Sequence, residues 1–432
     1  MNTCLISNLK LINNNNNIND NLYVEFIELT SLIIVTEAQI APLEEFHTFL
    51  EKCLHKHVLE YIVKPLTRPG DNFASVIQAL EVKTINNNDP TEIEMLNLVF
   101  KKPIPGFVNT YQSEQFLSEV HFYTDIIPAI KQFEESLNIP ETERIEAFAR
   151  YFGSRISLNP GAERVDMDAI ILFENLKSLN YHSPSQFDKD DIFAILKILA
   201  KLHALCIAMR RLQPHLFYSN VDPYLHNVYS RSFLDTIKFT ITDKFIEKEL
   251  ANFSEMPKSV QIAIKDLIKL CKNLLRNQNR IPDTPYTTFY HTDLWSKNIL
   301  IKKDGTNKNY TQVKIVDFQL YRYDTFVHDL VQFLLINARI NDLKTNFKSF
   351  IEYYHLEFVK TMRYTNCPLN DYTYEKIWKE IKDKAKYNLL DLYYYLAKRT
   401  IIWVFYMEQP TPKAIVNRLK CINDLYVENG LI

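Results

Sequence analysis

The segment 291–298, together with the apolar run that ends at Asp317, constrains this chain more than any other feature. One residue separates His291 from Asp293, and Asn298 follows five residues after that aspartate. Transfer of a phosphoryl group from a nucleotide needs one carboxylate that orients the attacking hydroxyl, and an amide and a second carboxylate that hold metal ions. Each piece alone is common, but their order and spacing together predict a kinase-like site.

Each polar side chain of this pattern has a predicted role. Asp293 would be the catalytic residue that accepts or orients the proton of the attacking hydroxyl. Asn298 and Asp317 would supply hard oxygen ligands for Mg²⁺. His291 would brace the loop through hydrogen bonds without entering the chemistry. Two alternatives stay open: both acids could simply cap and solvate ordinary turns, and Trp295 could either pack or line an acceptor pocket.

A lysine that grips the nucleotide is predicted ahead of this site. Lys101 ends an apolar run over residues 96–100 and would contact the α- and β-phosphates, with Glu119 on the following helix as its ion-pair partner. Lys102 is the alternative, because side chains alternate along a strand and only one of the two lysines can point inward. Lysines at strand ends and glutamates on helices are also common as solvated residues, so this assignment depends on the motif that follows.

Two backbone contacts with the nucleotide are also predicted. A Pro-Gly pair ending at Gly70 opens a turn that runs through Asn72 to Ser75. Backbone N–H groups there could meet phosphate oxygens, although most such pairs form ordinary turns. Glu174 ends an apolar strand. With Leu176 it would form the hinge between two lobes, where backbone groups could bond the edge of adenine.

The length of the chain and the order of its patterns predict two lobes. The chain has 432 residues, which is more than one domain usually needs. Strand patterns precede helical ones, so we expect an α+β fold with a small β-rich N-lobe over residues 41–175 and a larger, mostly helical C-lobe over residues 176–432. Residues 1–40 include an asparagine run at 13–17 and are expected to form a poorly ordered N-terminal extension.

The spacing of apolar residues places the individual elements. Strands are predicted over residues 61–63, 76–82, 95–101, 151–158 and 168–174, and helices over residues 42–61, 115–133, 190–209, 260–277, 374–384 and 389–407. The candidate catalytic segment then falls inside the helical C-lobe, after the strands that would carry Lys101.

Charge and composition exclude several kinds of partner. The net charge is −2, from 50 basic and 52 acidic residues, whereas nucleic acid binding calls for a basic surplus. Six cysteines are scattered with no Cys-x-x-Cys pair, which indicates a reduced, cytoplasmic protein. No run approaches the roughly 20 apolar residues that span a bilayer, so no membrane partner is expected. Nothing in the sequence predicts the oligomeric state.

Taken in chain order, these residues resemble the ecdysteroid-kinase-like family, also called CHK kinase-like, which is related to choline and aminoglycoside kinases. The similarity covers residues 70–334. It rests on Phe116-x-x-Glu119-x-x-Phe122-Tyr123, Glu174-Asn175-Leu176, Leu202-His203-Ala204, the segment 291–298, Asp317-Phe318-Gln319-Leu320 and Asp329-Leu330. The Asp-Phe-Gln motif resembles that of this family more than the Asp-Phe-Gly motif of protein kinases.

The resemblance implies a protein-kinase-like, two-lobed fold. It also implies ATP- and Mg²⁺-dependent phosphorylation of a hydroxyl on a small molecule, with steroid alcohols as the named example. The catalytic and metal-binding roles that it implies are those given above, and Asp329 is expected to anchor the catalytic loop. Three departures stand out. Thr292 occupies a position where the family usually has glycine, which predicts a strained or reshaped loop, and Asn175 replaces the usual hinge aspartate. The asparagine-rich N-terminal extension lies outside the family pattern.

Two other functions stay open. A pseudokinase-like protein would use the fold to hold a ligand without turnover; Thr292 favours this, and the intact catalytic and metal-binding side chains oppose it. A choline- or aminoglycoside-type kinase would need an acidic or aromatic cage for its cationic acceptor, which the sequence does not locate. A steroid-like or xenobiotic alcohol would need a large apolar pocket. Aromatic residues near the C-terminus could line it or simply pack a core: Tyr393, Tyr394, Tyr395, Trp403, Phe405 and Tyr406.

Overall fold

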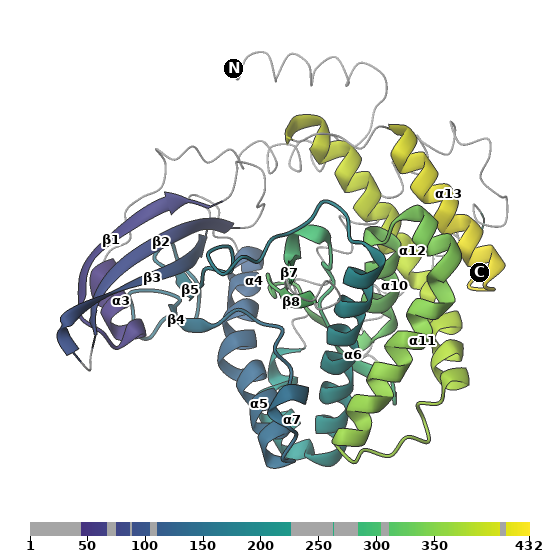
Figure 1. Ribbon diagram of the computed structural model, residues 1–432, viewed down its shortest axis with the longest axis horizontal. Helices are drawn as coiled ribbons and strands as arrows, with labels where there is room; N and C mark the ends of the chain where they lie inside the picture. Colours follow the sequence, from purple (N-terminus) through teal and green to yellow (C-terminus); the bar gives the residue numbers. More distant parts are fainter. Residues whose placement is uncertain are drawn as a thin grey trace.

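The computed structural model of the protein describes residues 45–66, 75–86, 89–103, 110–225, 262, 284–303, 311–406 and 412–432. The N-terminal extension, the turn at Gly70 and Asn72 and most of the helix expected over residues 260–277 lie outside these ranges, as do the side chains from Tyr393 to Tyr406. Within the described part, strands gather in the N-terminal half and helices dominate the rest (Figure 1).

Five antiparallel strands form one sheet, in the order β1–β2–β3–β5–β4 (Figure 1). They are β1 Val58–Pro65, β2 Ser75–Asn86, β3 Asp89–Pro103, β4 Tyr151–Arg155 and β5 Ile170–Glu174. The central strand β3 pairs along its length with β2 and, near its end, with β5, where Lys101 lies opposite Ile171. Lys101 is therefore held between two paired strands.

Helix α3, Phe46–Leu54, covers one face of this sheet and forms a separate core with β2, β3 and β5. The prediction of a helix over residues 42–61 is wrong in its second half. His55 adopts a left-handed backbone (φ 52) and ends the helix. The residues that follow pair with β2 instead, with Tyr61 opposite Val82.

A continuous helical rod leads from the sheet to the rest of the protein (Figure 1). It consists of α4 Thr110–His121, the π-helix η2 Phe122–Ile126 and α5 Ile127–Ser136. A π-helical turn contains an extra residue, so it changes which side chains share a face before and after it. Glu119 lies in the last turn of α4 and Phe122 begins the π-helix, and both take part in the site described below.

The described helices that follow pack on one another in the C-terminal part (Figure 1). They are α6 Lys189–Leu212, α7 Pro214–Asn220, α10 Val327–Asn337, α11 Ile340–Tyr364, α12 Tyr374–Tyr406 and α13 Pro412–Glu428. Helix α6 packs on α11, and α10 packs on α12. One helix, α12, stands where two are predicted over residues 374–384 and 389–407, since no glycine or proline interrupts it.

Of the described helices, α6 is the one that is long and apolar enough to cross a membrane, and 78% of its most apolar stretch is buried inside the protein. It begins at a capping box, in which Asp188 accepts the backbone N–H of Asp191 and Asp191 returns a bond to the backbone of Asp188. The apolar side chains of α6 thus serve a core.

Two short antiparallel ribbons hold the candidate site among the helices. Strand β6, Thr287–Tyr290, pairs with β9, Arg322–Thr325, and strand β7, Ile299–Lys303, pairs with β8, Thr311–Ile315. The four residues of β6 are buried. The segment 291–298 connects β6 to β7, and the segment 316–321 connects β8 to β9, so the pairings bring the two segments together.

An antiparallel five-stranded sheet followed by a mostly helical part is the predicted α+β, protein-kinase-like fold, which is confirmed. The limits of the two lobes stay predictions. One hydrophobic core runs from Phe116 to Leu431 and contains residues from both sides of Leu176.

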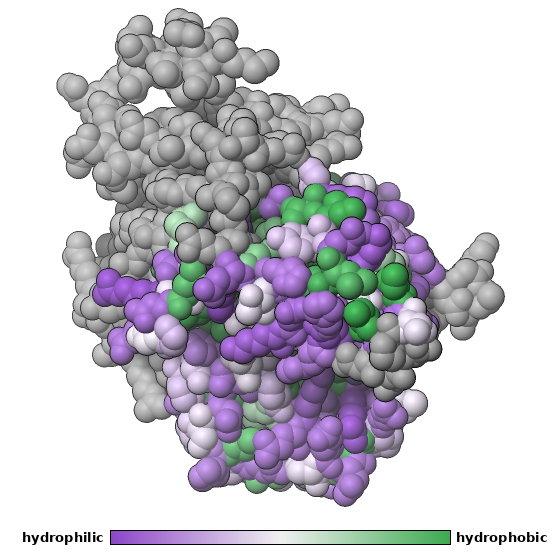
Figure 2. All heavy atoms as spheres, turned by 90° about the vertical axis from the view of Figure 1, so that its left-hand side faces the viewer, coloured by the Kyte–Doolittle hydropathy of each residue, from purple (hydrophilic) through white to green (hydrophobic). Residues whose placement is uncertain are grey.

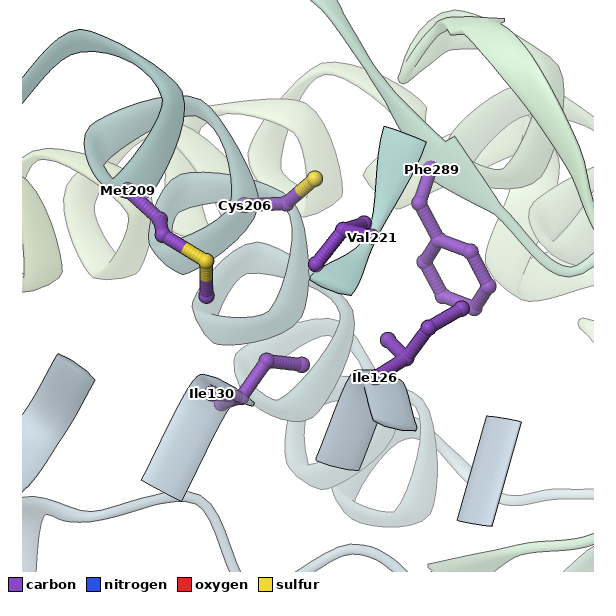
Figure 3. A pocket seen from close by; sticks show the side chains of 6 residues that line it. All are labelled: Ile126, Ile130, Cys206, Met209, Val221 and Phe289. Carbon is purple, nitrogen blue, oxygen red and sulfur yellow. The ribbon is translucent and has the colours of Figure 1, made fainter. Parts of the chain in front are cut away.

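A small pocket is enclosed by η2, α5, α6 and β6 (Figure 3). Its walls are Ile126, Ile130, Cys206, Met209, Val221 and Phe289. Burial raises the pKa of the Cys206 thiol, so this thiol stays protonated. The lining carries no charged side chain, and we regard the pocket as a packing gap in the core.

The side of the molecule that presents the sheet is mostly hydrophilic, with hydrophobic side chains scattered over it (Figure 2). The exposed apolar residues of the sheet lie on β1 and β3 and include Ile62, Ile93 and Met95. Glu60 and Lys64 lie among them on β1, and charges of this kind discourage pairing with a second sheet at an edge strand.

Gly153 of β4 lies so close to Cys53 of α3 that an added Cβ atom would overlap the Cys53 Sγ atom. Gly153→Ala should therefore lower the free energy of unfolding by about 1–3 kcal/mol, as overpacking does. Cys53→Ala removes the overlapping atom, so the double variant should recover most of that loss. Urea unfolding of the wild type and the three variants measures the coupling, and strictly additive losses would contradict the contact.

Candidate active site

One side-chain amide closes the loop between β6 and β7. Asn298 Nδ2 donates to the carbonyl oxygen of Asp293 at 3.0 Å and to its carboxylate Oδ2 at 3.1 Å. Because the nitrogen end of the amide faces Asp293, the oxygen end is the one that remains for a cation. The motif spacing thus brings the predicted catalytic acid into contact with the predicted metal-binding amide.

A buried carboxylate, Asp329, holds this loop through its backbone. It is fully buried and accepts the backbone N–H of His291 at 2.7 Å and that of Thr292 at 3.1 Å. His203 Nε2 lies 3.4 Å from the same carboxylate, and His203 Nδ1 lies 2.8 Å from the Tyr354 hydroxyl. Burial raises the pKa of Tyr354 well above its ordinary value, so the phenol stays neutral. Asp329 therefore has the anchoring contacts expected of it.

His291 makes the bracing contacts predicted for it. Its Nδ1 accepts the backbone N–H of Asp293 at 3.2 Å, and its Nε2 lies 3.0 Å from the carbonyl oxygen of Val316. A neutral imidazole with an accepting Nδ1 carries its proton on Nε2, which therefore donates to Val316. His291 thus connects the catalytic loop to the residue before Asp317.

The second part of the site is a buried ion-pair cluster around Lys101. Its Nζ donates to Glu119 Oε2 and, at 2.6 Å, to Asp317 Oδ1. Only 3% of Lys101 and 2% of Glu119 is exposed. Burial alone would lower the pKa of Lys101, but the charges of Asp317 and Glu119 raise it above the ordinary value. The ammonium therefore stays charged, as a phosphate-binding lysine must.

Lys102 lies on the other face of the sheet, because neighbouring side chains of a strand alternate. It pairs in register with Val76 of β2 and is also buried. Burial lowers its pKa, and Asp168 opposes this shift. Of the two candidate lysines, the structure brings Lys101 to Glu119 and Asp317.

An aromatic stack connects the two parts of the site. The fully buried ring of Phe318 stacks on Phe122, with centroids 3.8 Å apart and planes at 10°, and meets His291 edge-on at 4.6 Å. Phe122 follows Glu119 by one turn of the helical rod. The rod therefore carries both the partner of Lys101 and the partner of Phe318.

The segment after β5 is the one predicted to form a hinge. The Glu174 carboxylate accepts the backbone N–H of Arg150 at 2.8 Å, so this side chain serves the sheet. From Glu174 to Tyr181, every backbone N–H has a partner within the described residues except that of Leu176. Leu176 is buried. Unpaired buried N–H groups are rare, so this one is a candidate for a ligand that accepts a hydrogen bond.

The remaining predicted residues are placed as follows. Ser75 is buried at the start of β2, opposite Pro103, whereas Gly70 and Asn72 lie outside the described residues. Asn175 Oδ1 accepts the backbone N–H of Lys177 at 3.1 Å. An aspartate could accept the same bond, so asparagine preserves this turn.

Thr292 has φ 72, in the left-handed region, where a β-branched residue is strained. The strain expected from its replacement of glycine is therefore present. Its backbone N–H bonds Asp329, and its hydroxyl donates to the carbonyl oxygen of Leu320 at 2.9 Å. Glycine could not make the second bond, which ties the catalytic loop to the segment after Asp317.

Two residues of this geometry were not predicted from the sequence. Tyr354, the partner of His203, is one of many aromatic residues on amphipathic helices, and nothing in the pattern distinguishes it. The Gln319 side chain contacts both Lys101 and Asp317. The Asp-Phe-Gln motif on which the family resemblance rests is the sequence signal that could have found it.

Thr292→Gly and Thr292→Ala separate the strain from the hydrogen bond. Both variants lose the bond to Leu320, but only glycine relieves the left-handed backbone, which is worth about 1 kcal/mol. Thr292→Gly should therefore have a free energy of unfolding about 1 kcal/mol higher than Thr292→Ala in urea titrations. An alanine variant as stable as the glycine variant would show that the backbone at this position is not strained.

Solved structures similar to this chain include three small-molecule kinases or relatives of them. An ethanolamine kinase from Plasmodium vivax is 11% identical, with 97% of this chain and 98% of that chain covered and a TM-score of 0.43. The GDP complex of a wild-type aminoglycoside 2′-phosphotransferase is 12% identical, with 89% and 99% covered and a TM-score of 0.41. A choline/ethanolamine kinase family protein from Mesorhizobium loti is 10% identical, with 86% and 91% covered and a TM-score of 0.39.

A search of curated proteins found no match. The sequence profile of the ecdysteroid kinase-like family, in contrast, matches residues 69–367. That stretch is more than half of the chain and includes every site residue described above. The chain therefore belongs to the ecdysteroid kinase-like family and is a small-molecule kinase of that type.

Proposed function

We propose that this protein transfers the γ-phosphoryl group of ATP to a hydroxyl of a small molecule. The observation that carries the proposal is the pair of contact sets at one junction: Lys101 with Glu119 and Asp317, and Asp293 with Asn298. These are the side chains that phosphoryl transfer requires, since it depends on positioning and charge stabilisation.

ATP is proposed as the donor from the family resemblance, and the hinge and Lys101 are the groups that would hold it. The N–H group of Leu176 lacks a partner within the described residues. Adenine presents the accepting N1 atom on its hydrogen-bonding edge and guanine presents the accepting O6 atom. A donating hinge group suits either base, so the choice of adenine follows the family resemblance. Lys101 would contact the α- and β-phosphates, as the corresponding lysine does in kinases.

Asn298 and Asp317 fit a magnesium site. The backbone N–H of Val316 bonds the carbonyl oxygen of Asn298 at 3.0 Å, which places the residue before Asp317 against the end of the catalytic loop. Amide and carboxylate oxygens are the ligands that Mg²⁺ prefers, commonly together with nucleotide phosphates. A bound Mg²⁺ would neutralise phosphate charge.

Asp293 is the proposed proton acceptor. As the acceptor oxygen attacks the γ-phosphorus, its proton would pass to the Asp293 carboxylate, the new O–P bond would form, and the bond to the β-phosphate oxygen would break to release ADP. Asn298 orients the carboxylate through its bond to Oδ2. His291 and Asp329 act on the loop that carries Asp293.

For the acceptor we propose a steroid-like or xenobiotic alcohol, on the ground of the family. A choline- or aminoglycoside-type acceptor is the alternative within the same reaction, and ligand binding without turnover is the alternative outside it. The mutual contacts of Asp293 and Asn298 favour turnover. We also propose a cytoplasmic location, which suits four free thiols in the described residues: Cys53, Cys206, Cys367 and Cys421.

Asp293→Asn should lower kcat by about two to four orders of magnitude, because an amide cannot accept the hydroxyl proton. Its affinity for ATP with Mg²⁺ should stay close to that of the wild type. Turnover is measured as a mass gain of one phosphate across a panel of hydroxylated small molecules, and affinity by calorimetry. Wild-type turnover in this variant would remove Asp293 from the mechanism.

Lys101→Met should weaken ATP binding at least tenfold, because it removes the charge proposed to meet the phosphates. Lys102→Met removes an equally buried charge on the other face of the sheet and should leave ATP binding within about twofold of the wild type. Calorimetry gives the affinities, and thermal unfolding shows whether both variants are folded. If Lys102→Met weakened ATP binding more than Lys101→Met, the phosphate contact would be assigned to Lys102.

A further inference from the structure

The amide of Gln319 bridges two charged groups of the site. Its Oε1 accepts from Lys101 Nζ at 3.4 Å, and its Nε2 donates to Asp317 Oδ2 at 3.4 Å. With Glu119 Oε2 and Asp317 Oδ1, three acceptors therefore meet Lys101 Nζ. An ammonium has three N–H donors, so this buried ammonium has one partner for each donor.

The orientation of this amide follows from its neighbours. Turned by 180°, Gln319 would direct its NH₂ group at the Lys101 ammonium and its carbonyl oxygen at the Asp317 carboxylate, and both contacts would be repulsive. An amide offers an acceptor to the cation and a donor to the anion at once. A glutamate could serve Lys101 alone, and a glycine could serve neither.

The Asp317 carboxylate is held from both of its oxygens. Lys101 bonds Oδ1 and Gln319 bonds Oδ2, so the carboxylate cannot rotate without losing one partner. Its backbone adopts φ 69, which sets the direction in which the side chain leaves the chain. Without Gln319, the described contacts would leave Oδ2 unbonded, and the carboxylate could turn toward the ammonium.

We propose that Gln319 is a positioning residue that holds the Asp317 carboxylate in the orientation in which it meets a magnesium nucleotide. This inference rests on the proposed role of Asp317 as a metal ligand. Groups that orient a metal ligand without touching the metal commonly change metal affinity by 10- to 100-fold when they are removed. Both Gln319 contacts are long, so we expect an effect near the lower end of that range.

Gln319→Met tests the proposal, because methionine has a similar length and lacks both polar groups. Calorimetric titration of the full chain with ATP at a series of Mg²⁺ concentrations needs no acceptor substrate. The Mg²⁺ concentration that gives half of the maximal ATP affinity should rise about tenfold in the variant. At saturating Mg²⁺ the ATP affinity should return to within about twofold of the wild type.

Gln312→Met is the matched control, since Gln312 on β8 accepts a hydrogen bond from the Tyr181 hydroxyl and lies outside the site. It should leave the Mg²⁺ dependence unchanged. Gln319→Leu provides a second test if thermal unfolding shows that Gln319→Met is not folded.

Three results would be informative in different ways. A wild type whose ATP binding ignores Mg²⁺ would overturn the proposed metal role of Asp317, and the proposal for Gln319 with it. If ATP binding by the wild type depends on Mg²⁺ and both Gln319 variants show the same dependence, the positioning role alone would be overturned. Weakening by the same factor at every Mg²⁺ concentration would also overturn it, because Gln319 would then act on the nucleotide itself.

Discussion

The ion pair between Lys101 Nζ and Asp317 Oδ1 joins the sheet to the helical part across 216 positions of the chain. Removing an ion from water costs several kcal/mol, which only a well-placed opposite charge and further hydrogen bonds can offset. The surrounding elements meet that need. Strand β3 holds Lys101 between two neighbours, and α4 contributes Glu119 as a second buried partner. The packing of Phe318 on Phe122 keeps Asp317 within reach.

Local patterns in the sequence predicted most elements, but not where they end or join. Strands β2, β3, β4 and β5 and helix α6 lie where alternating and helical spacing placed them, within a few residues. The helix predicted over residues 42–61 was extended too far because apolar residues continue past His55, whereas the pairing of β1 with β2 depends on distant residues. In α12, Asn388 has a low helix propensity. It is accommodated because its side chain bonds the carbonyl oxygen of His328 on α10, a contact that no local pattern contains.

The candidate site was predicted only in part, because local patterns do not contain contacts between distant residues. Motif order indicated that Lys101, Glu119, Asp293, Asn298 and Asp317 belong together, and the structure brings them to one junction, although their roles remain proposals. The contacts of Tyr354 and Gln319, which support the site residues, were not predicted. Tyr354 reaches His203 from a helix 151 positions further along the chain. The bond between Gln319 and Lys101 depends on which of the two neighbouring lysines points into the site. Strand alternation allows only one of them to do so, and the positions of Glu119 and Asp317 decide that it is Lys101.

The anchor of the catalytic loop has a consequence for how such a loop can diverge. The hydrogen bonds that Asp329 accepts from His291 and Thr292 come from their backbone N–H groups. Every amino acid except proline carries that N–H group. A buried carboxylate of this kind therefore secures the course of the chain while leaving the identity of the residue open to change. The position where the family resemblance predicts glycine carries Thr292, and Asp293 keeps its contact with Asn298 despite the local strain. Selection on this loop can then act on chemistry and specificity separately from its shape.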